Sequence, residues 1–387
     1  MLKRAVVVDG VRTAVGRSHP QRGCFRDVRS DDLAAACVRA LLERTGVAAG
    51  EVEEVVLGCA KQTREQGFNV ARMVGLLAGL PCEAAGTTVN RLCGSGLQAL
   101  NQAVHAIMAG AEDVHVVGGL EHMHHLPLGE GRDPNLRLFH RTSPAAFHMG
   151  LTAEYLARRH EITREDQDRF ALRSHQRAAA AHAAGAFRRE IIPVWGRDEA
   201  GRRCRIDADQ CVRPDTSLPA LANLRPAFLP DGTVTAGNSA PLNNGAAALL
   251  VMSEDKAHAL GLQPLARVRA TAVAGVEPCL MGTGPVPATH KALQRAGLTL
   301  ADIDLVELNE AFAAQALACI RMLGLDEERV NVRGGAIAIG HPLGASGARI
   351  ATTLIHALRD RNATFGLATM CIGGGQGIAT IFERVAD

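Results

Sequence analysis

The chain has 387 residues, of which 47 % are hydrophobic and 21 % charged, a composition typical of a globular protein with a large core. Aromatic residues make up only 3 %, which argues against single-stranded nucleic-acid binding by stacking. The formal net charge of +2 gives no overall attraction to nucleic acid or a membrane surface. No apolar run approaches the roughly 20 residues that cross a bilayer. We therefore expect no nucleic-acid partner and no membrane span.

The cysteines indicate a reducing compartment. Their spacing is irregular and no CxxC pair occurs, so neither a zinc site nor a disulfide framework is indicated. The apolar run at the N-terminus is too short for a signal peptide. We expect free thiols and a cytoplasmic location. The cysteines are Cys24, Cys37, Cys59, Cys82, Cys93, Cys204, Cys211, Cys279, Cys319 and Cys371.

The first recognisable unit is the segment 40–58, ALLERTGVAAGEVEEVVLG. Its apolar residues follow a helical period and stop at Thr45-Gly46, which is a signal for a helix C-terminus. The run from Val55 to Leu57 then predicts a short buried strand.

Cys93 follows in the segment TTVNRLCGSGL. A strand-like run ends at Val89-Asn90, and a helical pattern covers Leu97 to Met108. A cysteine at such a turn lies at the positive end of a helix, which is expected to lower its pKa. Cys93 is therefore a candidate nucleophile. The alternative is a buried structural cysteine, the commoner fate of this residue type.

A strand is predicted from Val114 to Val117, and the stretch after it, about 120–238, differs from the rest. It is rich in His, Arg and Pro and contains one long helical pattern, about Arg164 to Ala184. We expect an insertion that acts as a lid or binding element. His122, His124 and His125 cluster here, but the sequence offers no convincing further ligands, so no metal site is expected.

The chain then repeats its first unit. The segment 291–309, KALQRAGLTLADIDLVELN, aligns without gaps with 40–58 at an offset of 251 residues. At the same offset, Gly94-Ser95-Gly96 meets Ala345-Ser346-Gly347. Alternating strands and helices in both copies predict two similar α/β halves with parallel βαβ units.

The second copy contains three further candidates. Asn309, in NEAFAAQ, follows a strand predicted from Leu305 to Leu308, where its amide could hold a water or an oxyanion or simply cap a helix. His341, in GGAIAIGHPLGASG, is held between Gly340 and Pro342 and is a candidate base. A structural His is the alternative, and a phosphate loop is disfavoured because neither GxGxxG nor GxxxxGK[ST] occurs.

Cys371 follows a strand predicted from Phe365 to Thr369 and precedes a run of glycines. Ligands of open α/β sheets bind beyond the carboxyl ends of strands. Cys93 and Cys371 thus occupy similar places in the two halves. A redox disulfide is the competing interpretation, although no oxidoreductase pattern accompanies them. Two cysteines, a histidine and an asparagine at such turns together suggest thioester chemistry.

Four motifs, in this order and spacing, resemble those of the thiolases: VNRLCGSG, NEAFAAQ, GHPLGASGAR and CIGGGQG. The resemblance runs from Val6 to Phe382. It is closest to bacterial degradative 3-ketoacyl-CoA thiolases, including the thiolase subunit of the fatty-acid oxidation complex. It implies two βαβαβαββ halves stacked face to face in α-β-α-β-α layers. The expected division is 1–119 with 239–263 for the first half, 120–238 for a loop domain that binds coenzyme A, and 264–387 for the second half.

The resemblance also implies a mechanism. His341 would remove the proton of Cys93, which attacks the 3-keto carbon, and Cys371 would protonate the departing acetyl-CoA carbanion. Coenzyme A, deprotonated by Cys371, would then take the acyl group from Cys93. One oxyanion hole would use His341 and a water held by Asn309. The other would use the backbone N–H groups of Cys93 and Gly373.

Further implications concern ligands and partners. Coenzyme A would be a substrate, with no cofactor and no metal. A homodimer or homotetramer is expected, with a hydratase–dehydrogenase subunit as a further candidate partner. The residues implied to contact substrate or coenzyme A are His148, Met149, Arg213, Phe228, Ala236, Gly237, Ala240, Ala311 and Phe312.

The sequence departs from the family in TAGNSAPLNNGAAA. Ala240 stands where the family has a serine that touches the pantetheine arm, while a serine precedes it at Ser239. Asn244 replaces the usual aspartate, and Pro241 is expected to reshape the loop. Two other functions follow as hypotheses. One is biosynthetic acetyl-CoA C-acetyltransferase activity, which forms acetoacetyl-CoA. The other is non-catalytic acyl-CoA or lipid binding.

Overall fold

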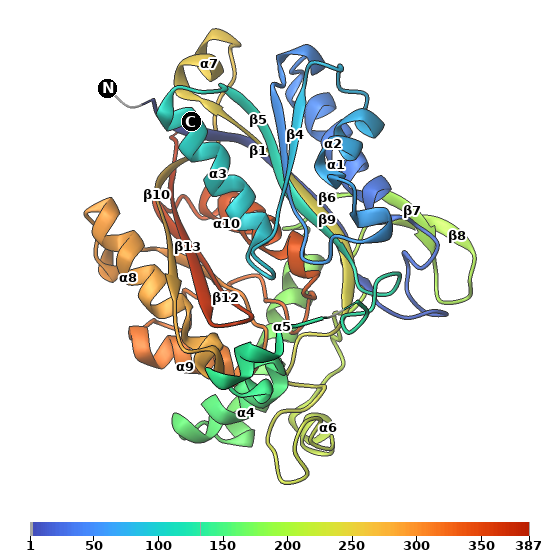
Figure 1. Cartoon of the computed structure of the whole chain (residues 1–387), viewed down its shortest axis with the longest axis vertical. Coiled ribbons are helices and arrows are strands. Elements are labelled where there is room, and N and C mark those ends of the chain that lie inside the picture. The colour runs from blue at the N-terminus through green and yellow to red at the C-terminus, as the bar shows by residue number, and fades with distance from the viewer. Residues whose placement is uncertain (1–2, 132, 387) are drawn as a thin grey trace.

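A computed structural model describes residues 3–131 and 133–386 (Figure 1). Its first half carries helices on both faces of a group of strands. The helices are α1 (Ser30–Thr45), α2 (Val70–Ala78), α3 (Ser95–Ala109) and the short α7 (Glu254–Ala259). The strands are β1 (Ala5–Thr13), β2 (Gly16–Arg17), β3 (Glu54–Gly58), β4 (Ala85–Val89), β5 (Val114–His122) and β9 (Asn243–Ser253).

The second half repeats this arrangement. Its helices are α8 (Pro285–Ala296), α9 (Ala313–Leu323) and α10 (Leu343–Asp360). Its strands are β10 (Ala266–Gly275), β11 (Leu305–Leu308), β12 (Phe365–Ile372) and β13 (Gln376–Arg384). The predicted repeat is visible at helix ends, because α1 and α8 both stop at left-handed glycines, Gly46 with φ 69° and Gly297 with φ 68°.

The main path of the sheet has the strand order β11-β12-β13-β10-β1-β9-β5-β3-β4. Corresponding strands pair in the same sense in the two halves: β3 lies parallel to β5 as β11 lies parallel to β12, and β5 runs antiparallel to β9 as β12 runs antiparallel to β13. The halves join where β1 runs antiparallel to β10, with Val6 opposite Arg267 and Val7 opposite Ala266. The strands predicted from 114 and from 365 are longer than expected and reach His122 and Ile372.

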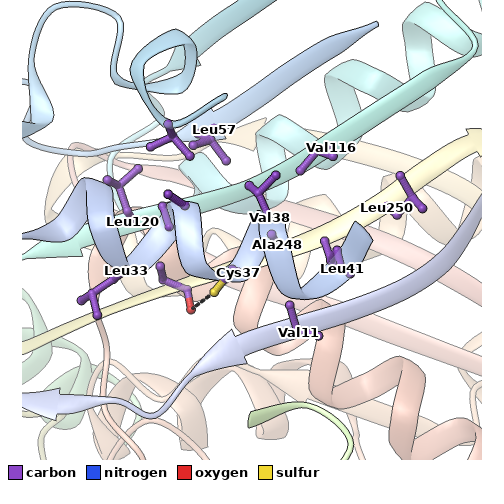
Figure 2. Packing of buried hydrophobic residues seen from close by; sticks show 14 of the residues in the cluster. Val11, Leu33, Cys37, Val38, Leu41, Leu57, Val116, Leu120, Ala248 and Leu250 are labelled. Atoms are coloured by element: carbon purple, nitrogen blue, oxygen red, sulfur yellow. Dashed lines mark hydrogen bonds between the residues drawn. The ribbon is translucent and has the colours of Figure 1, made fainter. Parts of the chain in front are cut away.

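Successive strand residues point to opposite sides of the sheet, and this alternation defines the layers. Val55 and Leu57 belong to a core cluster with α1 and α2, whereas Val56 joins a second cluster with α3 and α10. Figure 2 shows the first of these, with α1 side chains against strand residues and the Cys37 thiol directed at the carbonyl of Ala246. In the second half, Leu367 packs on the side of α8 and α9.

The middle cluster contains residues from both halves, including Leu97 on α3, Leu354 on α10, Leu249 on β9 and Met370 on β12. Helices α3 and α10 therefore form a central layer, with α1 and α2 on one outer side and α8 and α9 on the other (Figure 1). This is the predicted α-β-α-β-α order of the thiolase fold.

The segment between the halves contains its own elements, which extend to the lower and right sides of the view in Figure 1. The long helix predicted from Arg164 is α5, and it begins at a capping box formed by Thr163 and Asp166. The elements are α4 (Met149–Arg159), α5 (Arg164–Ala183), α6 (Leu218–Ala222), β6 (Ile191–Ile192), β7 (Val194–Arg197) and β8 (Arg203–Ile206). Among the described residues, none of the helices combines the length and apolar character needed to cross a membrane.

The central helices meet through residues without side chains. A Cβ added to Gly96 would lie 2.7 Å from the carbonyl oxygen of Gly344 and 2.8 Å from the backbone nitrogen of Ala348. A Cβ on Gly347 would collide with the backbone of Leu97. Only glycine at these positions permits the helix starts to come this close.

We predict that Gly96→Ala and Gly347→Ala each lower the free energy of unfolding by about 1–3 kcal/mol, the usual cost of overpacking. A loss of stability would be diagnostic, because alanine ordinarily stabilises a helix relative to glycine. Urea unfolding measures the change in the free energy of unfolding. Gly50→Ala is the matched control, because nothing lies within 4 Å of a Cβ added there. Equal stability of the central variants and this control would contradict the tight helix contact.

Candidate active site

Cys93 lies on a tight turn between β4 and α3. Leu92, directly before it, has a φ of 46°, an unusual left-handed conformation for a bulky residue. Side-chain hydrogen bonds hold this turn: the Leu92 N–H donates to Asn90 Oδ1 (2.9 Å), and the Arg91 N–H donates to Ser95 Oγ (2.9 Å). Ser95 in turn donates to the Leu92 carbonyl (2.6 Å). The strained backbone presents the thiol at the start of α3.

The protonation of Cys93 differs from the expectation. Burial raises the pKa of its thiol to about 11, and the backbone N–H of Gly373, which lowers this pKa, only partly opposes the shift. The charge of Glu121 raises the pKa further. The expected lowering by the helix terminus is therefore outweighed by desolvation, which disfavours the charged form. The resting nucleophile is a neutral thiol.

His341 lies two residues before the start of α10, in a loop shaped by Gly340, whose φ is 121°. The His341 N–H donates to Asn243 Oδ1 (2.9 Å). Its ring Nδ1 lies 2.6 Å from Ser346 Oγ, and its Nε2 lies 3.5 Å from the Asn309 amide nitrogen. Because that amide nitrogen can only donate, Nε2 is the acceptor and Nδ1 carries the proton. The ring is thus oriented with Nε2 as its basic nitrogen.

Burial, with the nearby positive charge of Arg349, lowers the pKa of His341 to about 3. The imidazole is therefore neutral at physiological pH and able to accept a proton. Asn309 follows β11, and its backbone N–H donates to the Thr369 carbonyl (3.0 Å). Its buried side-chain Oδ1 has no hydrogen-bond partner among the described residues. This free acceptor fits a site that holds a small polar ligand beside His341.

Cys371 is buried at the end of β12. Burial raises the pKa of its thiol well above the ordinary value, and the neighbouring thiols of Cys93 and Cys319 add to this shift. The structure thus brings Cys93, Cys371 and Gly373 together from the two halves, and it separately pairs His341 with Asn309. Cys371 belongs to an apolar cluster with Met149, Ala153, Val234, Met281, Ala311 and Phe312.

Several predicted substrate contacts gather around this cluster. Phe228 and Phe312 form an edge-to-face pair with centroids 6.0 Å apart. The Ala240 N–H donates to the Ala311 carbonyl (3.0 Å), which joins the exit of the insertion to the segment after Asn309. Met149 lies against Gly373, where an added Cβ would be 3.4 Å from its sulfur.

Four other predicted contacts are not members of the apolar cluster around Cys371. His148 is exposed at the start of α4, and Ala236 is exposed beside buried Gly237, which faces Leu221 and Leu224. Arg213 is also exposed, and its backbone N–H donates to His175 Nδ1 (3.2 Å). Their assignment to substrate or coenzyme A therefore stays a prediction.

The altered loop makes its own contacts. Ser239, which precedes the position where the family serine was expected, is buried and donates to the Thr235 carbonyl (2.7 Å). Its hydroxyl is directed into its own loop and does not substitute for the one missing at Ala240. Asn244 Oδ1 accepts from the His124 N–H (3.3 Å).

The histidine cluster has a neighbour that the sequence analysis missed. Glu65 lies beside His122 and His125, and the possible ligand atoms of the three side chains lie within 4.8 Å of one another, close enough to hold a metal ion. However, His122 Nε2 contacts the Phe25 carbonyl and its Nδ1 accepts from the His125 N–H, while His125 Nε2 contacts the Arg26 carbonyl. The remaining His125 nitrogen faces Glu65 at 3.1 Å. The ring nitrogens are thus engaged in hydrogen bonds that hold the loop.

Sequence reasoning also missed three residues that orient the site: Ser346, Asn243 and Glu121. Ser346 had one available signal, its alignment with Ser95 in the internal repeat. Asn243 and Glu121 carried none, because their partners are distant in sequence: Asn243 holds His341, and Glu121 accepts from the Gly344 N–H at 3.0 Å.

Comparison with known proteins identifies the family. Residues 5–255 match the model of the thiolase N-terminal domain, and residues 262–384 match that of the thiolase C-terminal domain. Proteins called 3-ketoacyl-CoA thiolase are similar over 99 % of this chain and 100 % of their own length, at 57 % identity in Pectobacterium carotovorum and 55 % in Shewanella frigidimarina.

Solved structures agree as well. The human mitochondrial 3-ketoacyl-CoA thiolase is 40 % identical, with a TM-score of 0.91 over 99 % of both chains. The Bacillus anthracis acetyl-CoA acetyltransferase, also 40 % identical, has a TM-score of 0.90 over 99 % of both chains. With both halves matched by the family models and with full-length relatives above half identity, this chain belongs to the thiolase family.

Proposed function

We propose that this chain is a 3-ketoacyl-CoA thiolase (acetyl-CoA C-acyltransferase) of fatty-acid β-oxidation. It cleaves a 3-ketoacyl-CoA with coenzyme A to give acetyl-CoA and an acyl-CoA shortened by one acetyl unit. The observation that carries this proposal is that the Cys93 thiol faces both the Gly373 N–H and the buried thiol of Cys371. The names of the full-length relatives support the degradative substrate class.

In the first half-reaction, His341 Nε2 accepts the thiol proton while the Cys93 sulfur attacks the 3-keto carbon. The carbon–carbon bond to the acetyl-CoA part then breaks, and its electron pair takes the proton of Cys371. The raised pKa of Cys371 supports this role, because the group must carry its proton when the carbanion forms. The acyl group remains on Cys93 as a thioester.

In the second half-reaction, the Cys371 thiolate takes the proton of an incoming coenzyme A. The resulting thiolate attacks the acyl carbon, and Cys93 leaves and recovers its proton from His341. The oxyanions would be stabilised by two donor sets: protonated His341 with a water on Asn309, and the N–H groups of Cys93 and Gly373. Donors positioned in advance stabilise such charge without reorganisation.

Coenzyme A acts here as a substrate, and the chemistry uses protein groups alone. Within the proposal, the segment 120–238 binds coenzyme A between the halves formed by 1–119 with 239–263 and by 264–387. Met149, Phe228 and Phe312 would contact the pantetheine arm. Met149 and Phe312 belong to the apolar cluster around Cys371, and Phe228 packs against Phe312. Arg213 would meet the nucleotide end.

We also propose a cytoplasmic homodimer or homotetramer, which could join a hydratase–dehydrogenase subunit. Self-association is supported by exposed apolar side chains near the edge strand β4. Phe68 is 91 % exposed, and Leu77 on α2 is 49 % exposed. An edge strand beside such side chains offers a surface for a second copy.

The central test is acylation of Cys93. Incubation with 3-ketoacyl-CoAs of several chain lengths should add the corresponding acyl mass to Cys93, as read by peptide mass spectrometry. Cys93→Ala should abolish the adduct and thiolysis while the fold is kept. Cys82→Ala, at an exposed cysteine, is the control. Normal thiolysis by Cys93→Ala would refute the mechanism, and cleavage of acetoacetyl-CoA alone would refute the degradative substrate class.

The raised pKa of Cys93 predicts how its reactivity depends on pH. With a pKa of about 11, the thiolate fraction increases about tenfold per pH unit throughout neutral and mildly alkaline solution. Alkylation of Cys93 by iodoacetamide in the free enzyme should therefore rise steadily from pH 7 to 10. No inflection is expected near pH 6.5, because the pKa of His341 is about 3. A plateau below pH 9 would show that a thiolate is already present.

The tautomer of His341 gives a further test. Ser346→Ala removes the acceptor of the Nδ1 proton of His341. The ring can then carry its proton on Nε2 instead, and in that tautomer Nε2 cannot act as the base. We expect kcat of thiolysis to fall by about 10- to 100-fold, below the roughly 10⁴-fold loss for a wrongly held catalytic histidine, with a small change in KM. Ser346→Thr retains the hydroxyl and should be less impaired. Equal kcat of the alanine and parent enzymes would contradict the assignment.

A further inference from the structure

Glu121 is the penultimate residue of β5, only 1 % exposed, and it has no role in the mechanism above. Its oxygens contact donors from three segments. Oε2 accepts from the N–H groups of Ala60 (2.9 Å) and Gly344 (3.0 Å). Oε1 accepts from the Lys61 N–H (3.2 Å) and from Gln66 Nε2 (2.6 Å).

These contacts favour the ionised form of the group. All four partners can only donate, so among the described residues each carboxylate oxygen accepts two hydrogen bonds that a carboxyl proton would disrupt. Burial raises the pKa of Glu121, and the backbone and Gln66 hydrogen bonds oppose that shift. A buried charge held by four donors is a costly feature to maintain, which indicates that its position matters.

One branch of this network leads to the base. Gly344 lies in the first turn of α10, and His341 is on the loop that enters this helix. The Gly344 N–H would otherwise be an unpaired donor at a helix start. By accepting it, a carboxylate from the first half of the chain fixes the start of a helix that belongs to the second half.

The other branch leads to the nucleophile. Ala60, which donates to Glu121 through its N–H, accepts at its carbonyl from Asn90 Nδ2 (3.0 Å). Asn90 Oδ1 then accepts from the Leu92 N–H (2.9 Å), at the left-handed residue before Cys93. Glu121 is thus joined to the Cys93 turn and to the His341 loop by hydrogen bonds linked through short stretches of backbone.

We infer that Glu121 is a positioning residue of the thiolase reaction, which holds the Cys93 turn and the His341 loop in register through Ala60–Asn90 and Gly344. The inference rests on the proposed function. The negative charge of Glu121 has a second consequence, because it opposes formation of the Cys93 thiolate. The Cys371 thiol also faces Cys93, and the Cys59 thiol faces Glu121.

The test compares Glu121→Gln with the parent in two assays. Glutamine has one acceptor oxygen, so two of the four donors lose their partner. We expect kcat of thiolysis to fall by about tenfold or more, since small misplacements of reacting groups cost this much, with KM for coenzyme A within about twofold. Alkylation of Cys93 by iodoacetamide at pH 8 should become about threefold faster, because a negative charge near the thiol is removed.

The two assays separate the possible outcomes. A merely structural role would lower the folded fraction and leave Cys93 in the folded enzyme no more reactive than in the parent. If either the fall in kcat or the faster alkylation is missing in the folded variant, the inference is wrong. Failure of the proposed function is distinguishable, because the parent enzyme would then show no thiolysis while alkylation could still be compared.

Two further variants provide controls. Glu154→Gln alters another buried carboxylate that accepts backbone N–H groups, those of Thr233 (3.0 Å) and Val234 (2.9 Å), and should leave the alkylation rate unchanged. Asn90→Ala interrupts only the branch to Cys93 at an exposed side chain, so it tests the network if Glu121→Gln does not fold. It should lower kcat by about fivefold or more, and an unchanged kcat would overturn the inference.

Discussion

The contact between the starts of α3 and α10 is the constraint on which the site depends. Gly96 and Gly347 allow the helices to meet backbone to backbone, and Gly119 lets β5 approach the carbonyl of Gly344 in the same place. Cys93 lies two residues before the first residue of α3, and His341 lies two residues before the first residue of α10. Close packing of small residues therefore delivers the candidate nucleophile and base to one end of the central layer. The low aromatic content of the chain, 3 %, is consistent with a core in which the backbones of helices and strands lie close together.

The duplication explains how one site came to use both halves. At the repeat offset of 251 residues, Asn90 corresponds to His341 and Ser95 corresponds to Ser346. In the first half, Asn90 and Ser95 hydrogen-bond the backbone around Cys93. In the second half, Ser346 binds the ring of His341 instead. In the first copy, Asn90 and Ser95 thus hold the turn that contains Cys93. In the second copy, the corresponding residues are the base, His341, and the hydroxyl that orients it, Ser346.

The electrostatics of the site favour neutral groups at rest. Burial raises the pKa of the thiols of Cys93 and Cys371 and lowers that of His341. A thiolate–imidazolium pair would require two charges in an apolar setting, which is costly without full hydrogen bonding. In the proposed mechanism, charge develops when substrate brings its carbonyl to the donors, so proton transfer is coupled to attack. An uncharged thiol is also less open to oxidation and alkylation, since the thiolate is the reactive form.

The sequence by itself determined the repeated α/β architecture, the reaction class implied by its motifs, and the candidates Cys93, His341, Cys371 and Asn309. Those inferences rested on local patterns: strand and helix periods, glycine caps such as Gly46 and Gly297, and residues at the ends of strands. What only the tertiary structure decided was protonation and orientation. The pKa of Cys93 depends on burial, which no local pattern reports, and the expected lowering by a helix terminus was wrong for that reason. The roles of Asn243 and Glu121 depend on partners far along the chain, such as Gly344 beside Glu121. Hydrogen bonds of this kind form between segments that only the packing of the two halves brings together, so their physical cause lies in the fold and not in any stretch of sequence.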